Sequence, residues 1–132
     1  MNKRIKSLVL AAVMVIMFAV PVMAQKMDFS FSVEDAEDTS PVAYSDNARK
    51  DNNSSQAFIE CKKSNITEND DFGFWIVGQK GDNSAWTNYI RATANTGTYR
   101  PIYNRTYYQG NMYRLKGETF LYYVKVEGEF EP

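Results

Sequence analysis

Tyrosine and tryptophan are the residue types through which this chain could bind a ligand. After residue 24 it holds 18 aromatic residues but only two leucines, Leu115 and Leu121. Ring faces pack on the C–H-rich faces of sugars, and tyrosine hydroxyls add hydrogen bonds at the rim. The rings that could form such a platform are Trp75, Trp86, Tyr99, Tyr103, Tyr107, Tyr108, Tyr113 and Tyr123. Of these we favour as ligand-binding aromatics Trp86, Tyr103, Tyr107, Tyr113 and Tyr123.

The alternative is that the rings build the core. Apart from alanine and the single cysteine, the chain after residue 24 offers fourteen non-aromatic apolar side chains, namely five Ile, five Val, two Leu and two Met. That is too few for a domain of 108 residues, so we expect most Phe and both Trp to be buried. Adjacent tyrosines such as Tyr122-Tyr123 point to opposite faces of a strand, which turns one ring of each pair outward.

Most catalytic chemistry is excluded by composition. The chain has no histidine, which removes the usual general base near neutral pH and any Ser-His-Asp triad. Cys61 is the only cysteine, so neither an intrachain disulfide nor a multi-thiolate zinc site can form. Its position two residues after Ile59 predicts a buried, inert thiol, with intermolecular pairing as the alternative. We expect no catalytic residue and no cofactor.

The acidic residues suggest no metal site. The run at residues 34–38 could gather calcium but lacks the ligand spacing of an EF-hand loop. A glycosidase would need two carboxyl groups facing each other. Nothing in the pattern brings Glu60, Glu118 and Glu127 together in this way. We interpret these carboxylates as solvated.

Residues 1–24 have the organisation of an export signal. Lys3, Arg4 and Lys6 precede the apolar run Leu8–Val20, which is followed by Pro21 and Ala24. Thirteen apolar residues are short for a membrane anchor, so we predict a signal-peptide helix that is cleaved before Gln25. All 16 acidic but only 12 of the 15 basic residues follow, giving residues 25–132 a net charge of −4. We therefore expect one secreted, extracellular domain that binds no nucleic acid and is released without stable membrane insertion or held non-covalently at the cell surface.

Alternation of apolar and polar residues predicts strands, and no window shows a sustained helical period. The expected strands are residues 28–33, 57–62, 72–77, 86–91, 99–108, 111–116 and 120–127. The strand at 72–77 is apolar on both faces and should be central. The sequence thus predicts an all-β fold, a small antiparallel sandwich or barrel of about six to eight strands.

Glycine marks the expected turns. We predict tight hairpins at residues 95–97, 109–111 and 116–118, and a longer turn at 78–83. Pro101 indicates an edge strand or a bulge. Residues 34–56 are rich in Asp, Ser and Asn, which predicts a long, flexible surface loop.

Several short motifs follow one another in order: Phe29-Ser30-Phe31, then Arg100-Pro101-Ile102-Tyr103-Asn104, then Tyr108-x-Gly110, and finally Gly128-x-Phe130-x-Pro132. This order resembles a domain-of-unknown-function family of small secreted proteins from Gram-positive bacteria. Phe130 stands where that family has tryptophan. The resemblance implies a small β-fold and export, and it implies no activity.

These observations favour a secreted, non-enzymatic protein with an aromatic-rich sheet face. Its expected partner is cell-wall polysaccharide or an envelope protein. The alternative is a small bacteriocin-like or signalling polypeptide that acts on neighbouring cells.

Overall fold

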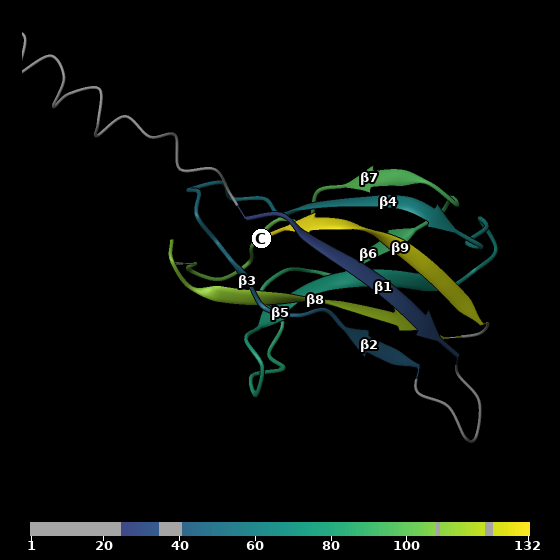
Figure 1. The fold of residues 1–132 in the computed structure, drawn as a ribbon, viewed down its shortest axis with the longest axis horizontal. Coiled ribbons are helices and arrows are strands. Elements are labelled where there is room, and N and C mark those ends of the chain that lie inside the picture. The colour runs from purple at the N-terminus through teal and green to yellow at the C-terminus, as the bar shows by residue number, and fades with distance from the viewer. Residues whose placement is uncertain (1–24, 35–40, 108, 121–122) are drawn as a thin grey trace, which may run out of the picture.

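A computed structural model describes residues 25–34, 41–107, 109–120 and 123–132. The predicted signal peptide, residues 1–24, lies outside the described residues. The described chain forms nine β-strands and no helix, arranged as two antiparallel sheets that face each other (Figure 1). The predicted antiparallel sandwich is confirmed, and the two sheets do not close into a barrel. In the described part of the chain, no helix is long and apolar enough to cross a membrane.

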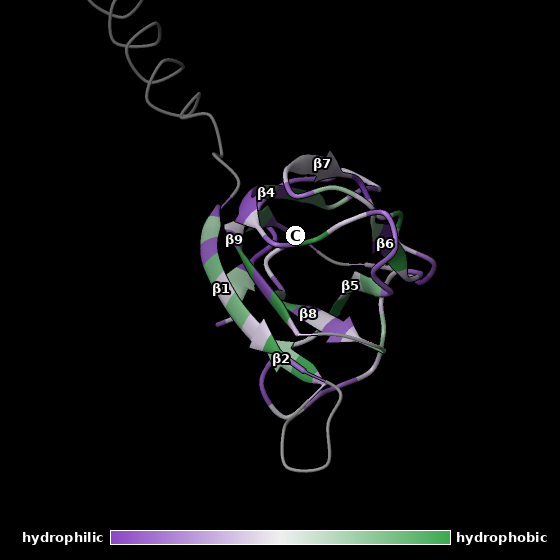
Figure 2. Ribbon diagram, turned by 90° about the vertical axis from the view of Figure 1, so that its right-hand side faces the viewer, coloured by the Kyte–Doolittle hydropathy of each residue, from purple (hydrophilic) through white to green (hydrophobic). Residues whose placement is uncertain are grey.

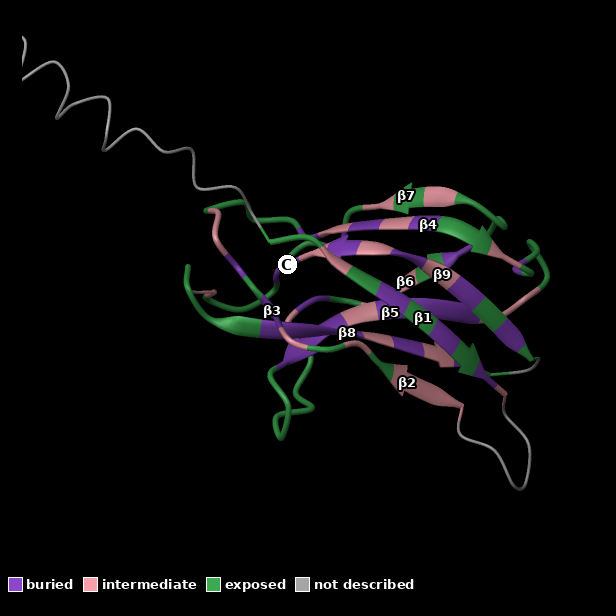
Figure 3. Cartoon of the chain, viewed as in Figure 1, coloured by how far each residue is buried: buried purple, intermediate pink, exposed green. Residues whose placement is uncertain are grey.

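Sheet A has four strands. In spatial order they are β1 (Met27–Val33), β9 (Val124–Glu131), β4 (Phe58–Ser64) and β7 (Gly97–Tyr99). Along β1, Phe29, Phe31 and Val33 are buried, whereas the residues between them are exposed (Figure 3). The period of two predicted from the sequence therefore decides which side chains of this strand face the core.

Sheet B has five strands. In spatial order they are β2 (Val42–Tyr44), β8 (Met112–Thr119), β5 (Phe72–Gly78) and β6 (Ile90–Ala92), and β3 (Ala48–Arg49) also pairs with β8. The central position predicted for residues 72–77 is confirmed, because β5 pairs with β6 on one side and β8 on the other.

Phenylalanine dominates the core between the sheets. Phe74 of sheet B is fully buried, with its ring centre 5.8 Å from that of Phe29 in sheet A and 5.0 Å from that of Phe72. Figure 2 views the sandwich along its strands, with the strands of both sheets around one interior. The core expected from the shortage of aliphatic residues is thus built largely from rings, although Trp75 and Trp86 are only half-buried.

The turn predicted at residues 116–118 is wrong. These residues lie inside β8, where Gly117 pairs with Phe74 and with Ala43. A β-carbon on Gly117 would clash with the rings of Phe31 and Phe72. Glycine is needed here for close packing of the core and not for chain reversal.

The region between β5 and β8 also differs from the prediction. Of the strand expected at 86–91, only residues 90 and 91 lie in a strand, β6 (Ile90–Ala92). Of the described residues in the strand expected at 99–108, only Tyr99 does, at the end of β7 (Gly97–Tyr99). The turn at residues 95–97 joins β6 of sheet B to β7 of sheet A, so it is a crossover and not a hairpin. Cross-sheet connections of this kind have no local sequence signal that separates them from hairpins.

The segment predicted as one long surface loop contains two strands. Residues 35–40 lie outside the described residues, but β2 and β3 both pair with β8, and Ala48 and Lys50 are fully buried. The Lys50 amide donates to the Asn111 carbonyl oxygen at 2.9 Å. Backbone hydrogen bonds along β8 hold this polar segment in place, which apolar composition alone could not reveal.

Candidate functional site

The outer face of sheet A is polar and charged. Because side chains alternate along a strand, β1 turns Asp28, Ser30 and Ser32 outward, opposite Glu129, Glu127 and Lys125 of β9. Next to β9, β4 contributes Glu60 and Lys62 to the same face. This face therefore carries hydrogen-bonding groups of both charges.

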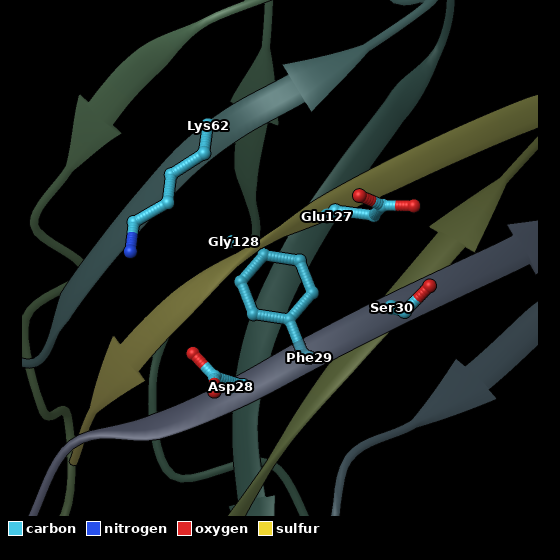
Figure 4. A pocket seen from close by; sticks show the side chains of 6 residues that line it. All are labelled: Asp28, Phe29, Ser30, Lys62, Glu127 and Gly128. Atoms are coloured by element: carbon cyan, nitrogen blue, oxygen red, sulfur yellow. The ribbon is translucent and has the colours of Figure 1, made fainter.

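A hollow of about 470 Å³ lies on this face over Gly128 (Figure 4). Asp28 and Lys62 lie on one side of the Phe29 ring, and Ser30 and Glu127 lie on the other. Opposite Gly128, the pairing of β4 with β9 shifts by one residue between Cys61 and Lys63. The hollow lies at this β-bulge, where the regular pairing of the two strands is interrupted.

An ion pair neutralises part of the charge on the outer face of sheet A. Lys62 forms an ion pair with Glu129, which also neighbours Asp28 and Glu60 across the sheet. The hydrogen bond between the two side chains raises the pKa of Lys62 and lowers the pKa of the Glu129 carboxyl. Lys62 thus offsets repulsion among three carboxylates on adjacent strands.

A second hollow of about 320 Å³ meets the first at Glu127, and Tyr123 lines it. Tyr123 is 48% exposed, and its hydroxyl accepts a hydrogen bond from the Ser32 hydroxyl at 3.0 Å. Its carbonyl oxygen accepts from the Asn65 side-chain amide at 3.1 Å. The predicted ligand residue Tyr123 is therefore exposed and held in place, on the charged face of the sandwich.

The outer face of sheet B carries a row of aromatic rings, which we call the aromatic row: Trp75, Tyr89 and Phe120. The ring centres of Trp75 and Tyr89 are 4.6 Å apart, and those of Tyr89 and Phe120 are 6.2 Å apart. Trp75 and Tyr89 are half-buried, and Phe120 is 43% exposed. The contacts among these three rings make one continuous apolar strip.

Local contacts hold the aromatic row in place on the sheet. The Tyr89 ring lies over Gly73, where a β-carbon would clash with the ring. The Tyr89 hydroxyl donates to Asp71 at 3.3 Å, and burial is the main cause that raises its pKa. The Lys116 ammonium lies 4.6 Å from the Trp75 ring centre and pairs with Glu118 at 3.1 Å. Charged groups thus border the aromatic row along β8.

The other predicted ligand-binding aromatics lie elsewhere. Tyr103 and Tyr113 are only 8% and 1% exposed, so neither offers a ring face to a polymer at the surface. Trp86 and Tyr107 are half-buried, and each contacts one of these two rings. Burial of ring area against neighbouring rings stabilises this arrangement more than exposure would.

A buried lysine sits among these tyrosines. The Lys50 ammonium lies 4.6 Å from the Tyr103 ring centre and 4.9 Å from that of Tyr107, and it donates to the Asn52 side-chain oxygen at 3.1 Å. Burial lowers the pKa of Lys50 from 10.5 to about 8, against the attraction of Glu131. The sequence gives no hint of this burial, since Lys50 stands among charged and polar residues in the predicted loop.

Comparison of the chain with family models, curated proteins and solved structures finds no match in any of the three.

The described residues contain no group of three or more Asp, Glu, Cys or His side chains that could hold a metal ion. Cys61 is buried as predicted, and burial raises the pKa of its thiol to about 12. Its low thiolate fraction and its position beneath sheet A make it unsuited to nucleophilic chemistry. The outer faces offer hydrogen-bonding groups on sheet A and ring surfaces on sheet B.

Proposed function

We propose that this protein is a secreted, non-enzymatic module that binds a polysaccharide of the cell envelope through the aromatic row. The observation that carries the proposal is the contact of Trp75, Tyr89 and Phe120 in one strip on the outer face of sheet B. Aromatic side chains on a surface supply large contact areas at low cost in side-chain entropy. The rings are tilted against one another, by 50° between Trp75 and Tyr89 and by 78° between Tyr89 and Phe120, and offer neighbouring contact points to a chain of sugar units, whose C–H-rich faces recur along the polymer.

The surroundings of the aromatic row also favour a sugar polymer. Lys116 and Glu118 lie beside Trp75 on β8, and Arg91 follows on β6. These groups can donate to and accept from hydroxyls at the rim of the rings. Among the described residues, the exposed ring on the outer face of sheet A is that of Tyr123, which cannot share a platform with rings on the opposite side of the sandwich.

Sedimentation with purified, protein-free cell-wall polysaccharide tests the proposal. We expect the chain to co-sediment, and Phe120→Ala and Trp75→Ala each to weaken binding about tenfold, as expected for an aromatic residue at the centre of an interface. Tyr123→Ala is the matched control, because Tyr123 and Phe120 are similarly exposed but lie on different sheets.

The control variant separates the two faces. Loss of binding in Tyr123→Ala with retention in Phe120→Ala would move the site to sheet A and contradict the proposal. Absence of binding to the polysaccharide, with capture of an envelope protein instead, would also overturn it. Thermal unfolding of each variant shows whether the fold is intact.

A further inference from the structure

A third hollow lies at one end of sheet B, between the turn that follows β5 and the beginning of β8. We call it the loop pocket. It has a volume of about 270 Å³, and the side chains relevant here are Gln79, Asp82, Trp86, Asn111 and Tyr113. Its lining includes a carboxylate, two amides, an indole and a phenol. Such polar surroundings are unlike a gap left by imperfect core packing, which is apolar.

A buried arginine fixes one wall of the loop pocket. Arg114 is 8% exposed, and its Nε donates to the Gly78 carbonyl oxygen at 3.1 Å. Its Nη2 donates to the Asp82 carbonyl oxygen at 3.2 Å and to the Asn83 side-chain oxygen at 2.8 Å. Three bonds from one guanidinium hold the turn in a single conformation. The pocket is therefore shaped before any ligand arrives, which lowers the entropic cost of binding.

The carboxylate of Asp82 is a fixed acceptor. The Ser84 hydroxyl and amide donate to its Oδ1 at 2.6 Å and 3.0 Å. These bonds are the main cause that lowers the pKa of the Asp82 carboxyl, with smaller contributions from Arg105 and from the Trp86 N–H. The side chain is ionised at neutral pH and can accept further hydrogen bonds.

Two residues that line the pocket carry polar atoms without a partner. The hydroxyl of Tyr113 is buried and makes no hydrogen bond within the described residues, and the buried Nε1 of Trp86 has no partner there at normal hydrogen-bond geometry, although it acts on the Asp82 carboxyl closely enough to help lower its pKa. The hydroxyl of Tyr103, whose ring contacts that of Tyr113, is also buried and makes no hydrogen bond within the described residues. Buried polar groups are nearly always paired, and each unpaired group costs stability. Their occurrence together beside a polar hollow points to a ligand that completes them.

The surrounding charges restrict that ligand. The ionised Asp82 disfavours an anion. Arg114 and the Arg105 guanidinium, which lies 4.4 Å from the Trp86 ring centre, disfavour a cation. A hydroxyl group can accept from the Trp86 N–H and donate to Asp82 at the same time. We propose that the loop pocket binds a single neutral sugar ring, with vicinal hydroxyls placed between Asp82, Trp86 and Tyr113.

Titration of the ¹⁵N-labelled full chain with glucose and with N-acetylglucosamine tests this inference. The chain contains two tryptophans. We expect the indole N–H resonance of Trp86 to shift with at least one of the sugars, while the resonance of Trp75 stays in place. Sodium acetate serves as the charged control and should shift neither. No shift at Trp86 with either sugar, or a shift with acetate alone, would overturn the inference.

Two conservative variants test the contacts by calorimetry. Trp86→Phe and Tyr113→Phe each remove one hydrogen-bonding atom and keep a ring, and we expect each to weaken sugar binding about tenfold. A merely structural role would leave the affinity unchanged, and this result would contradict the inference. The inference does not rest on the proposed function of the aromatic row. Phe120→Ala tests the aromatic row and Trp86→Phe tests the loop pocket, so either prediction can fail while the other holds.

Discussion

The two outer faces of the sandwich differ in how their side chains are used. On sheet A, Lys62 and Glu129 pair with each other, and the surface is low over Gly128. On sheet B, Trp75 and Tyr89 lie against each other over a glycine and leave an apolar strip at the surface. A charged face needs no partner, because its groups satisfy one another or bind water. An exposed strip of rings is better explained by a partner that covers it.

The largest expected effect lies in the core that both faces share. Phe74→Ala should lower the free energy of unfolding by about 3–5 kcal/mol, since its fully buried ring joins the two sheets. Denaturant unfolding monitored by tryptophan fluorescence and by far-UV circular dichroism should show one transition for both probes. A loss below about 1 kcal/mol would mean that the sheets do not depend on this contact.

Lys50 should produce the next largest effect, away from both faces. Its pKa is about 8 in the folded chain and 10.5 in the unfolded chain, so between these values only the unfolded chain holds the proton. Stability should therefore rise with pH across this window, by roughly 3 kcal/mol in total from Lys50 alone.

The variant Lys50→Met isolates this contribution. The wild-type chain should gain stability relative to Lys50→Met as the pH is raised from 7 to 10, measured by urea unfolding. Subtracting the variant matters, because Cys61 and Tyr103 have raised pKa values and destabilise the fold at high pH in both proteins. A difference that does not change with pH would show that the Lys50 ammonium is solvated.

Gly73→Ala should change sheet B without touching sheet A. The added methyl group would meet the Tyr89 ring and the Ile90 carbonyl oxygen, so we expect a loss of about 1–3 kcal/mol in stability. Displacement of Tyr89 should also weaken polysaccharide binding, measured by sedimentation. Unchanged binding in a folded Gly73→Ala variant would remove Tyr89 from the site.

The smallest effect is expected from the ion pair on sheet A. Lys62→Ala should leave polysaccharide binding and the thermal midpoint essentially unchanged, because an exposed pair stabilises little. The pKa of the Glu129 carboxyl should rise towards its ordinary value, which a carboxyl-resolved NMR titration would detect. An unshifted pKa would mean that the pair does not persist in solution.

Most of the fold that could be predicted from the sequence follows from the local alternation of apolar and polar residues. It identified β1, β4 and β5, the burial of Phe74 and Ile76, and the sandwich itself. It could not place Gly117, because a glycine that lets rings approach and a glycine that turns the chain look alike in sequence. It also missed β2 and β3, whose backbone pairs with a strand some seventy residues away.

The site was predicted less completely for a related reason. Trp75 was among the rings considered for a platform, but its neighbours Tyr89 and Phe120 come from other segments and meet it only in the fold. Tyr103 and Tyr113 were expected at the surface because alternation alone does not say which face of a strand is covered. Strand order and the docking of residues 41–56 decide that, and both depend on long-range contacts.

The most direct test of the account is a map of backbone amide shifts in the ¹⁵N-labelled chain on addition of a soluble cell-wall oligosaccharide. Binding through the aromatic row should give the largest shifts in β5 and β6, at Tyr89 and at Phe120, with little change in β1 and β9. Shifts concentrated around Tyr123 and Glu127, with the aromatic row undisturbed, would contradict the assignment of binding to sheet B.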